Sequence, residues 1–355
     1  MMKIATITFH WATNYGAVLQ AFALQKYLEK SGYEAEIIDY VPSRVKLLSY
    51  VTWIRRKKFG EFRKEKLIGK FRHAELKLSE KKYRSCKKLK STSFDYDCII
   101  SGSDQLWNKN FTLNLDGGKP NLSYFLDFAD EKTVKLAYAV SFGATHMPDE
   151  YYDRVKPFAN AFQAISVREQ TAIPIVEQMG RKAEIVCDPT LLLDRADYEK
   201  LIEKKRYQCG KVFCYILHEN QYTAQKIAQE VKKIYRENED RTARDDMYAW
   251  LYKIKNSEIV VTNSFHGTML ALIFNTPFIV VPVEGFDMND RIKTILDVVH
   301  LENRIVSDTD ADVLRSLCSE KIDWDQVNRS MAQYSRTGKD FLSSNLAMYA
   351  EKDKQ

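Results

Sequence analysis

Hydrophobic and polar positions along the chain follow two patterns: short apolar runs typical of buried strands, and longer stretches with helical spacing. In the first half, the predicted strands are residues 3–9, 34–40, 96–101, 134–141, 164–168 and 183–188. Helical spacing lies between them, at residues 17–30, 151–162 and up to about 179. Repeated strand and helix units of this length predict a parallel sheet with helices on both faces.

A second series of strands and helices begins near residue 211. Its predicted elements are a strand at 211–217, a helix from Tyr222 to about Arg236, a strand at 258–261, a helix at 268–274 that Pro277 stops, and a strand at 278–281. After Arg291 the pattern is mainly helical. We therefore predict an α/β protein of two Rossmann-like domains, residues 1–193 and 194–355, with a basic helical insertion at about 43–93.

Composition narrows the functional classes. A chain of 355 residues with 45% hydrophobic content is long enough for two globular domains. No run approaches the roughly 20 apolar residues of a membrane span, and residues 1–9 lack a signal-peptide pattern, so we expect a cytoplasmic protein. The six cysteines have no CxxC or Cys/His spacing, and we expect them to be reduced and mostly buried, with neither disulfides nor a zinc site.

Positive charge is concentrated between Arg44 and Lys90. This stretch holds 18 Lys or Arg residues against 4 Glu, a net +14 in a chain whose net charge is +6. Apolar residues that include Trp53, Phe59 and Phe62 alternate with the charges, as in a solvated helical insertion or in a helix pair on an anionic surface. No nucleic-acid-binding motif lies beside it, so a peripheral contact with the inner face of the cell membrane is the favoured functional interpretation.

Parallel sheets bind ligands at the carboxyl ends of their strands, and polar side chains gather there in this sequence. The acceptor-binding candidates, from the loops after the first strand and after residues 96–101, are Asn14, Tyr15, Ser103, Asp104, Gln105 and Trp107. The indole of Trp107 would suit stacking on a sugar ring. The structural alternatives are a tight turn at Gly16 and an Asx-type turn with a buried Trp107.

Arg168 stands where the strand at 164–168 gives way to a helix. If its side chain points into a cleft, the planar guanidinium would bind a carboxylate or phosphate. If it pairs with Glu169 or with a neighbouring helix, its role is structural.

The stretch VVTNSFHGTMLALIFNTPFIVV, residues 260–281, places a polar knot between two apolar arms. A loop between a strand and a helix presents backbone N–H groups at the positive end of the helix, where anions bind. The donor-binding candidates in this half are Ser264, His266, Gly267, Thr268 and Arg291. The alternative is that Ser264 or Asn263 caps the helix and His266 is a satisfied buried histidine.

Six segments carry a family resemblance. NYGAVLQAFAL, SGSDQLWN, AYAVSFG, SVRE, DPTLLL and TNSFHGT, in this order and spacing, resemble the polysaccharide pyruvyl transferase family from Lys3 to about Arg304. The combination is far more specific than any single segment. It implies a two-Rossmann-domain arrangement like that of the GT-B glycosyltransferases, with phosphoenolpyruvate as donor and a sugar hydroxyl pair, free or on a lipid-linked oligosaccharide, as acceptor. Asn263 stands where the family more often has aspartate.

The resemblance also implies catalytic roles for two residues. Arg168 matches the arginine expected to hold the donor's anionic groups, and His266 matches the histidine expected beside the donor phosphate. An imidazole can donate or accept the proton that formation of a pyruvate ketal requires. We expect alanine variants of both residues to fold normally and to lose transfer.

Phosphoenolpyruvate would be a co-substrate, and we expect no cofactor and no metal. The ketal would belong to a cell-surface polysaccharide. Two alternatives stay open at this point: a GT-B-type glycosyltransferase that uses a nucleotide sugar, and a non-catalytic sugar-binding protein of capsule assembly.

Overall fold

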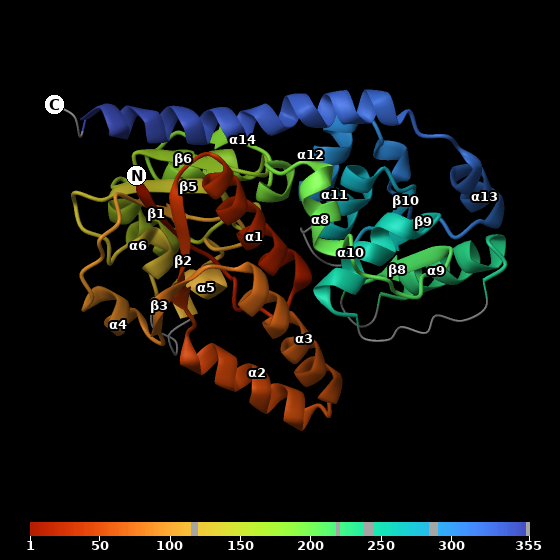
Figure 1. The fold of residues 1–355 in the computed structure, drawn as a ribbon, viewed down its shortest axis with the longest axis horizontal. Helices are drawn as coiled ribbons and strands as arrows, with labels where there is room; N and C mark the ends of the chain where they lie inside the picture. The colour runs from red at the N-terminus through yellow and green to blue at the C-terminus, as the bar shows by residue number, and fades with distance from the viewer. Residues whose placement is uncertain (115–119, 218–220, 238–244, 284–289, 353–355) are drawn as a thin grey trace. The chain divides into compact units, whose positions relative to one another are not determined.

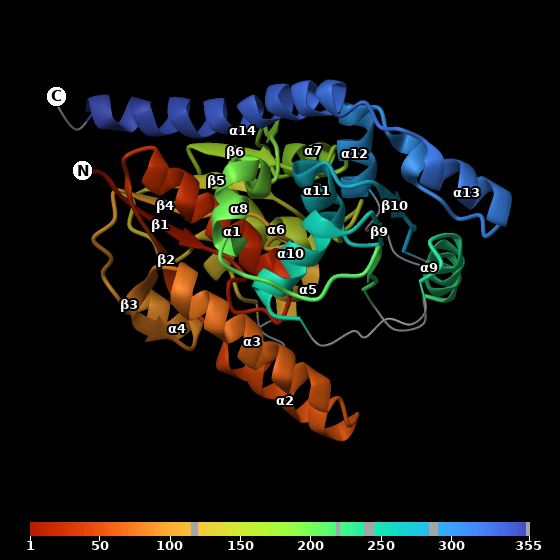
Figure 2. The same cartoon turned by 45° about the vertical axis from the view of Figure 1, so that its right-hand side comes forward.

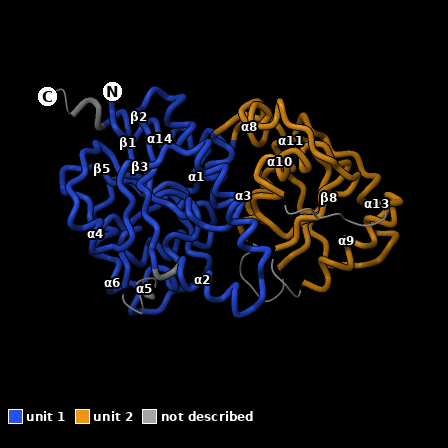
Figure 3. The backbone as a smooth tube through the Cα atoms, turned by 60° about the horizontal axis from the view of Figure 1, so that its bottom comes forward, with its two compact units in different colours: residues 1–192, 334–355 blue, residues 193–333 orange. Residues whose placement is uncertain are grey.

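The computed structural model describes residues 1–114, 120–217, 221–237, 245–283 and 290–352. The chain divides into two compact units (Figure 3). One contains Met1–Leu192 and Tyr334–Gln355, and the other contains Leu193–Gln333. The predicted domain boundary at residue 193 lies at this division. The end of the chain differs from the prediction, because the residues from Tyr334 onward belong to the first unit and not to the second domain.

The first unit is built on a seven-stranded parallel sheet with the order β3-β2-β1-β4-β5-β6-β7 (Figure 1). Its strands are β1 (Lys3–Ile7), β2 (Glu34–Tyr40), β3 (Leu78–Tyr83), β4 (Cys98–Ser101), β5 (Val134–Val140), β6 (Ala164–Val167) and β7 (Glu184–Ile185). Its helices are α1 (Tyr15–Lys30), α2 (Ser43–Arg55), α3 (Phe59–Glu75), α4 (Cys86–Lys90), α5 (Lys109–Asn114), α6 (Asp149–Ala159), α7 (Ala172–Gln178), and the short 3-10 turns η1 (Ser123–Phe125) and η2 (Pro189–Leu191). The predicted α/β class with a parallel sheet is confirmed.

The strand order reverses between β1 and β4. From β1 the chain proceeds to β2 and β3 on one side, and from β4 it proceeds to β5, β6 and β7 on the other. The loops that leave the carboxyl ends of β1 and β4 therefore turn in opposite directions. Sheets of this kind bind ligands at such a reversal, so a ligand site is expected at these two loops.

β3 is a strand that the sequence patterns do not predict. Its sequence LSEKKY carries three charged residues and lies inside the stretch expected to be purely helical. β3 lies at the edge of the sheet and pairs with β2, and charged side chains are common on edge strands, where one face stays in water. The basic insertion at 43–93 is thus corrected to the helices α2 and α3, the edge strand β3 and the short helix α4.

The second unit has a three-stranded parallel sheet with the order β10-β9-β8. Its elements are α8 (Arg195–Ile202), β8 (Val212–Tyr215), α9 (Tyr222–Ile234), α10 (Met247–Asn256), β9 (Ile259–Thr262), α11 (Phe265–Phe274), β10 (Phe278–Val280), α12 (Asp290–Val299), η4 (Glu302–Arg304) and α13 (Ala311–Ser319). The predicted order of strand, loop, helix and strand around residue 264 is confirmed. Every residue of α11 is buried, which fits its almost wholly apolar sequence.

The last helix, α14 (Trp324–Lys352), packs on the first unit through the residues after position 333 (Figure 2). Thr337 Oγ1 accepts a hydrogen bond from the backbone N–H of Cys187 at 3.2 Å. Gly338 lies so close to the sheet that a Cβ atom there would meet the hydroxyl of Tyr138 and would lie 2.8 Å from Cys187 Sγ. The absence of a side chain at Gly338 is therefore what lets the helix reach the sheet.

We predict that Gly338→Ala lowers the free energy of unfolding by about 1–3 kcal/mol, because the added methyl group overpacks this contact. Gly69→Ala in α3 is the matched control, since a Cβ there would meet only Arg72 at 3.7 Å. Removing a helical glycine without a clash should stabilise by about 0.5–1 kcal/mol. Denaturant unfolding of both variants measures the difference, and a Gly338→Ala protein as stable as Gly69→Ala would contradict the close packing of α14.

Candidate functional site

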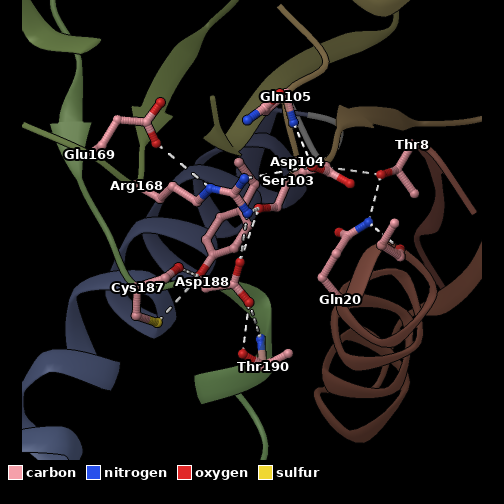
Figure 4. Close-up of polar contacts among 12 residues, drawn as sticks. Thr8, Gln20, Ser103, Asp104, Gln105, Arg168, Glu169, Cys187, Asp188 and Thr190 are labelled. Atoms are coloured by element: carbon pink, nitrogen blue, oxygen red, sulfur yellow. Dashed lines mark hydrogen bonds and ion pairs between the residues drawn. The ribbon is translucent and has the colours of Figure 1, made fainter. Parts of the chain in front are cut away.

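The loops at the strand reversal are tied together by hydrogen bonds (Figure 4). Thr8, just after β1, donates from Oγ1 to the carbonyl oxygen of Ser103, just after β4, at 2.9 Å. Gln20 of α1 in turn donates from Nε2 to Thr8 Oγ1 at 2.8 Å. Gly102 permits this approach, because a Cβ there would already lie 3.2 Å from that of Thr8. The first turns of α1 and the loop after β4 are thus held in one position.

Arg168, which follows β6, is buried among carboxylates (Figure 4). Its Nη1 donates to Asp188 Oδ2 at 3.0 Å and to Ser103 Oγ at 3.2 Å. Ion-pair distances of 3.7 Å join the same guanidinium to Asp104 and to Glu169. One cation and three carboxylates give this cluster a formal charge of −2. A buried guanidinium requires such partners, so a structural role for Arg168 is established in the cluster whatever it does with a ligand.

Asp188 is the member of this cluster that the sequence analysis does not single out. Its side chain is buried, and both of its oxygens are used. Oδ2 accepts from Arg168, while Oδ1 accepts from the backbone N–H of Thr190 at 3.0 Å and from its hydroxyl at 2.7 Å. Its position in the sequence could have identified it. Asp188 follows the apolar run at 183–187, and Arg168 ends the preceding run, so both residues stand at the carboxyl end of a predicted strand.

Asp104 has a backbone conformation that is rare for a residue with a side chain. Its φ is +91°, and its carbonyl oxygen accepts from the N–H of Ser141 at 3.0 Å, while its Oδ1 accepts from the N–H of Gln105 at 2.8 Å. The Gln105 side chain lies over Gly143, where a Cβ would be 2.5 Å from Gln105 Cδ. Conformations of this kind cost about 1–3 kcal/mol, persist only where neighbours hold them, and cluster at functional sites. Asp104 and Gln105 are partly exposed and stay the acceptor-binding candidates of this loop.

Trp107 does not form a sugar-binding surface, and the prediction that it does is wrong. Its side chain is fully buried, and its ring stacks on that of Phe125 with centroids 4.3 Å apart. The indole N–H donates to the carbonyl oxygen of Tyr124 at 3.0 Å. The alternative of a buried Trp107 is therefore the correct one, because the core satisfies both the ring and its single donor.

Asn14 and Tyr15 begin α1 and have structural roles there. Asn14 is the N-cap, and its Oδ1 accepts from the N–H of Ala17 at 3.2 Å while the residue stays exposed. Tyr15 is buried, and the Nζ of Lys64 lies 5.1 Å from the centre of its ring. Of these two candidates, only Asn14 has a side chain that a ligand could reach in the structure.

At the start of α11, three of the donor-binding candidates are hydrogen-bonded to one another. Ser264 is the N-cap, and its Oγ accepts from the N–H of Gly267 at 3.3 Å. Thr268 is fully buried and donates from Oγ1 to the carbonyl oxygen of Ser264 at 3.1 Å. Because Thr268 is buried, this corrects the prediction that it binds the donor, and the cap supports the structural alternative for Ser264.

Asn263 joins the ends of β9 and β8. Its side chain forms a two-way pair with the backbone of Leu217, accepting at Oδ1 from the N–H at 2.6 Å and donating from Nδ2 to the carbonyl oxygen at 2.9 Å. An ionised aspartate, which the family resemblance leads us to expect at this position, would have no N–H to donate. The amide therefore extends the pairing of the two strands in this chain.

His266 and Arg291 lie at the first turn of α11. His266 is 8% exposed, and its ring packs edge-on against Phe265 with centroids 5.1 Å apart. Arg291, from the first turn of α12, places its guanidinium 5.5 Å from the centre of the Phe265 ring. The second unit thus gathers an imidazole and a guanidinium at the positive end of a buried helix, which is a favourable place for an anion.

The remaining chemistry of the described residues is limited. No three His, Cys, Asp or Glu side chains within the described ranges are arranged to hold a metal ion. None of the six cysteines, all of them within the described residues, forms a disulfide, but only Cys98 and Cys187 are buried, so the prediction that most are buried is wrong. Burial raises the pKa of the Cys187 thiol to about 12, which makes it a poor nucleophile. In the part of the chain that the structure describes, no helix is both long and apolar enough to cross a membrane.

Comparison with known proteins decides the family. A model of the polysaccharide pyruvyl transferase family matches residues 14–285, which is more than half of the chain. The chain belongs to this family. The match covers the cluster around Arg168 and the loop before α11, but it ends before Arg291. A search of curated proteins found no match.

Solved structures with a similar fold cover nearly the whole of this family member. The UDP-N-acetylglucosamine 2-epimerase of Methanocaldococcus jannaschii aligns over 96% of this chain and 99% of its own, with 12% identity and a TM-score of 0.52. The epimerase of the same name from Rickettsia bellii aligns over 100% of this chain and 99% of its own, with 11% identity and a TM-score of 0.50. UGT89C1 of Arabidopsis thaliana complexed with UDP aligns over 97% of this chain and 100% of its own, with 8% identity and a TM-score of 0.51. At these identities the likeness shows the fold alone, and it confirms the GT-B-like arrangement.

We predict that Trp107→Ala destabilises the first unit by about 3–5 kcal/mol, the usual effect of removing a large buried aromatic side chain. Trp107→Phe should recover part of this loss, because the stacking on Phe125 is kept. Denaturant unfolding measures both changes. A Trp107→Ala protein that is fully stable and shows only a raised KM for the acceptor would restore the sugar-binding role.

We predict that Arg168→Ala lowers the free energy of unfolding by about 3–5 kcal/mol, because it leaves buried carboxylates without their cation. This revises the expectation that the variant folds normally. The double variant Arg168→Met/Asp188→Asn is the control, since it removes the charge pair as a unit and keeps the acceptor for Thr190. If the single and double variants are equally stable, the ion pair does not hold the cluster together.

Proposed function

We propose that this polysaccharide pyruvyl transferase takes its pyruvyl group from phosphoenolpyruvate and forms a ketal with two hydroxyls of a sugar acceptor. The observation that carries the proposal is that His266 and Arg291 both lie against the ring of Phe265, at the first turn of α11. Phosphoenolpyruvate carries a phosphate and a carboxylate. A guanidinium and the positive end of a helix favour both groups, and an imidazole beside them can transfer a proton.

The proposed chemistry balances without a further reactant. A proton adds to the methylene carbon of phosphoenolpyruvate, which becomes a methyl group and leaves C2 electrophilic. One sugar hydroxyl forms a C–O bond to C2, the bond from C2 to the phosphate oxygen breaks, and the second hydroxyl closes the ketal. The two hydroxyl protons account for the methyl hydrogen and for the proton on the released phosphate. His266 is our candidate for the group that protonates the methylene carbon.

In this proposal the first unit serves the acceptor. The cluster around Arg168 has three carboxylates for one guanidinium, so it suits hydroxyl groups better than a second anion. Asp104 and Gln105 are partly exposed and can accept from or donate to sugar hydroxyls. We assign to Arg168 the positioning of these groups, and its contact with the donor stays a prediction from the family resemblance. The acceptor would be a sugar, free or on a lipid-linked oligosaccharide.

We predict that His266→Ala lowers kcat for phosphate release by about 10²- to 10⁴-fold, the usual contribution of a positioned acid or base. Arg291→Gln should instead raise the KM for phosphoenolpyruvate. Arg291→Lys should have a KM between those of the parent and the Gln variant, because it keeps the charge but replaces the planar guanidinium with a point charge. His146→Gln, which changes an exposed histidine of the first unit, is the matched control and should behave as the parent.

The measurement is phosphate release from phosphoenolpyruvate with a panel of sugar acceptors, run beside nucleotide release from nucleotide sugars. Phosphate release that depends on the acceptor supports the proposal. Nucleotide release in its place would make the protein a glycosyltransferase. Release from neither donor across the panel would favour a non-catalytic sugar-binding protein and would overturn the proposal.

A further inference from the structure

The helices α2 and α3 form an antiparallel hairpin on the first unit (Figures 1 and 2). Near the turn, Trp53 packs edge-on against Phe62 with ring centroids 5.1 Å apart, and Tyr50 stacks on the same ring at 5.6 Å. One turn further along, Lys46 Nζ contacts Glu65 Oε1 at 2.7 Å. One face of α2 is therefore fully occupied by α3.

Glu65 links the hairpin to the rest of the first unit by hydrogen bonds and ion pairs. Its carboxylate accepts from Arg72 and Lys46, and also from the hydroxyl of Thr13 at 2.6 Å, in the loop after β1. Burial opposes its ionisation, but Arg72, Lys46 and Thr13 outweigh burial and hold the Glu65 pKa below its usual value. Two of the basic residues of the insertion are thus used inside the protein and are not part of its outer surface.

The outward face of α2 is apolar. Its exposed side chains at helical spacing are Leu47, Leu48, Val51 and Ile54, of which Leu47 and Ile54 are 62% and 60% exposed. At the turn, Phe59 is 66% exposed. Most of the large hydrophobic side chains exposed in the described residues lie on this one hairpin. Of the three aromatic residues expected from the sequence only Phe59 is among them, because Trp53 and Phe62 are packed between the helices.

The outward face of α3 is basic. Its exposed stripe, spaced by four, three and four residues, consists of Phe59, Arg63, Lys66 and Lys70. Ile68 and Phe71 are buried on the side of α3 that faces the unit. In each helix, the exposed stripe lies about 100° to 120° around the helix axis from the face that contacts the other helix, measured in the direction in which the chain turns. Because the helices are antiparallel, equal rotations bring both stripes to the same side of the hairpin.

We propose that this side of the hairpin, the α2–α3 face, binds to the surface of an anionic phospholipid bilayer. Residues 43–75 contain eleven Lys or Arg and three Glu, and the exposed Arg63, Lys66 and Lys70 of α3 are the bases of this segment that complement anionic headgroups. The leucine, valine and isoleucine side chains of α2 enter the boundary between headgroups and acyl chains, while the bases of α3 and the exposed Arg55, Arg56 and Lys57 at the turn stay at the headgroups. The inference does not depend on the identity of the donor.

The two stripes make separate contributions that experiment can resolve. Leu47→Ser/Val51→Ser/Ile54→Ser should weaken binding to vesicles of phosphatidylcholine with phosphatidylglycerol by at least about tenfold, even at low salt, because burial of apolar surface is lost. Arg63→Gln/Lys66→Gln/Lys70→Gln should weaken it by a similar factor. What binding remains in this variant should be less sensitive to salt near about 0.15 M than that of the parent. Sedimentation of the full chain with vesicles measures both.

Lys81→Gln/Lys87→Gln/Lys88→Gln is the matched control, since it removes three exposed charges of the same unit outside the hairpin. It should bind as the parent does. Equal loss in this control would show a response to net charge alone, and binding of the parent to phosphatidylcholine alone, or to neither vesicle, would overturn the proposal. Analytical ultracentrifugation without vesicles supplies the other decisive outcome: a parent dimer that the serine variant converts to a monomer would make this face a contact between two copies of the chain.

Discussion

The ion pair between Arg168 and Asp188 holds the candidate site of the first unit together. It joins the residue after β6 to the residue that caps η2, and through Ser103 it reaches the loop after β4. That loop is bonded in turn to Thr8 after β1. Burying a guanidinium is costly in free energy unless it is compensated at short distance, so the position of each strand end is coupled to that of the others. The unusual backbone of Asp104 is sustained within this network.

The two units offer different electrostatic environments, and this difference determines which unit is proposed to bind the donor and which the acceptor. Around Arg168 the carboxylates outnumber the cation, whereas His266 and Arg291 lie at the positive end of α11. A donor with two anionic groups is favoured at the second and opposed at the first. Hydroxyl groups, which are neutral and can both donate and accept, have no such conflict with a carboxylate cluster. The proposed division of donor and acceptor between the units thus follows from charge.

The sequence predicts the sheets well, because nearly every strand is a buried apolar run. The sequence does not predict β3, because an edge strand needs no apolar run. It does not identify Asp188 as part of the site, because a lone aspartate after a strand looks like a turn residue. Trp107 shows the limit of residue type as a guide. An indole beside polar residues fits a sugar surface and a core equally well, and only the neighbours Phe125 and Tyr124 decide between them. The partners of a polar or aromatic side chain are set by tertiary contacts that spacing does not encode.

The basic insertion illustrates the same limit on a larger scale. Its net charge is visible in the sequence, but a net charge does not say which bases face water. Glu65 draws Lys46 and Arg72 inward, and Tyr15 lies under Lys64, while Arg63 and its neighbours on α3 remain outside. The aromatic residues separate in the same way, since a ring that packs between two helices cannot also enter a membrane. The surface chemistry of the hairpin is therefore fixed by the helical register that Glu65 imposes, and a change at Glu65 would alter that surface without touching an exposed residue.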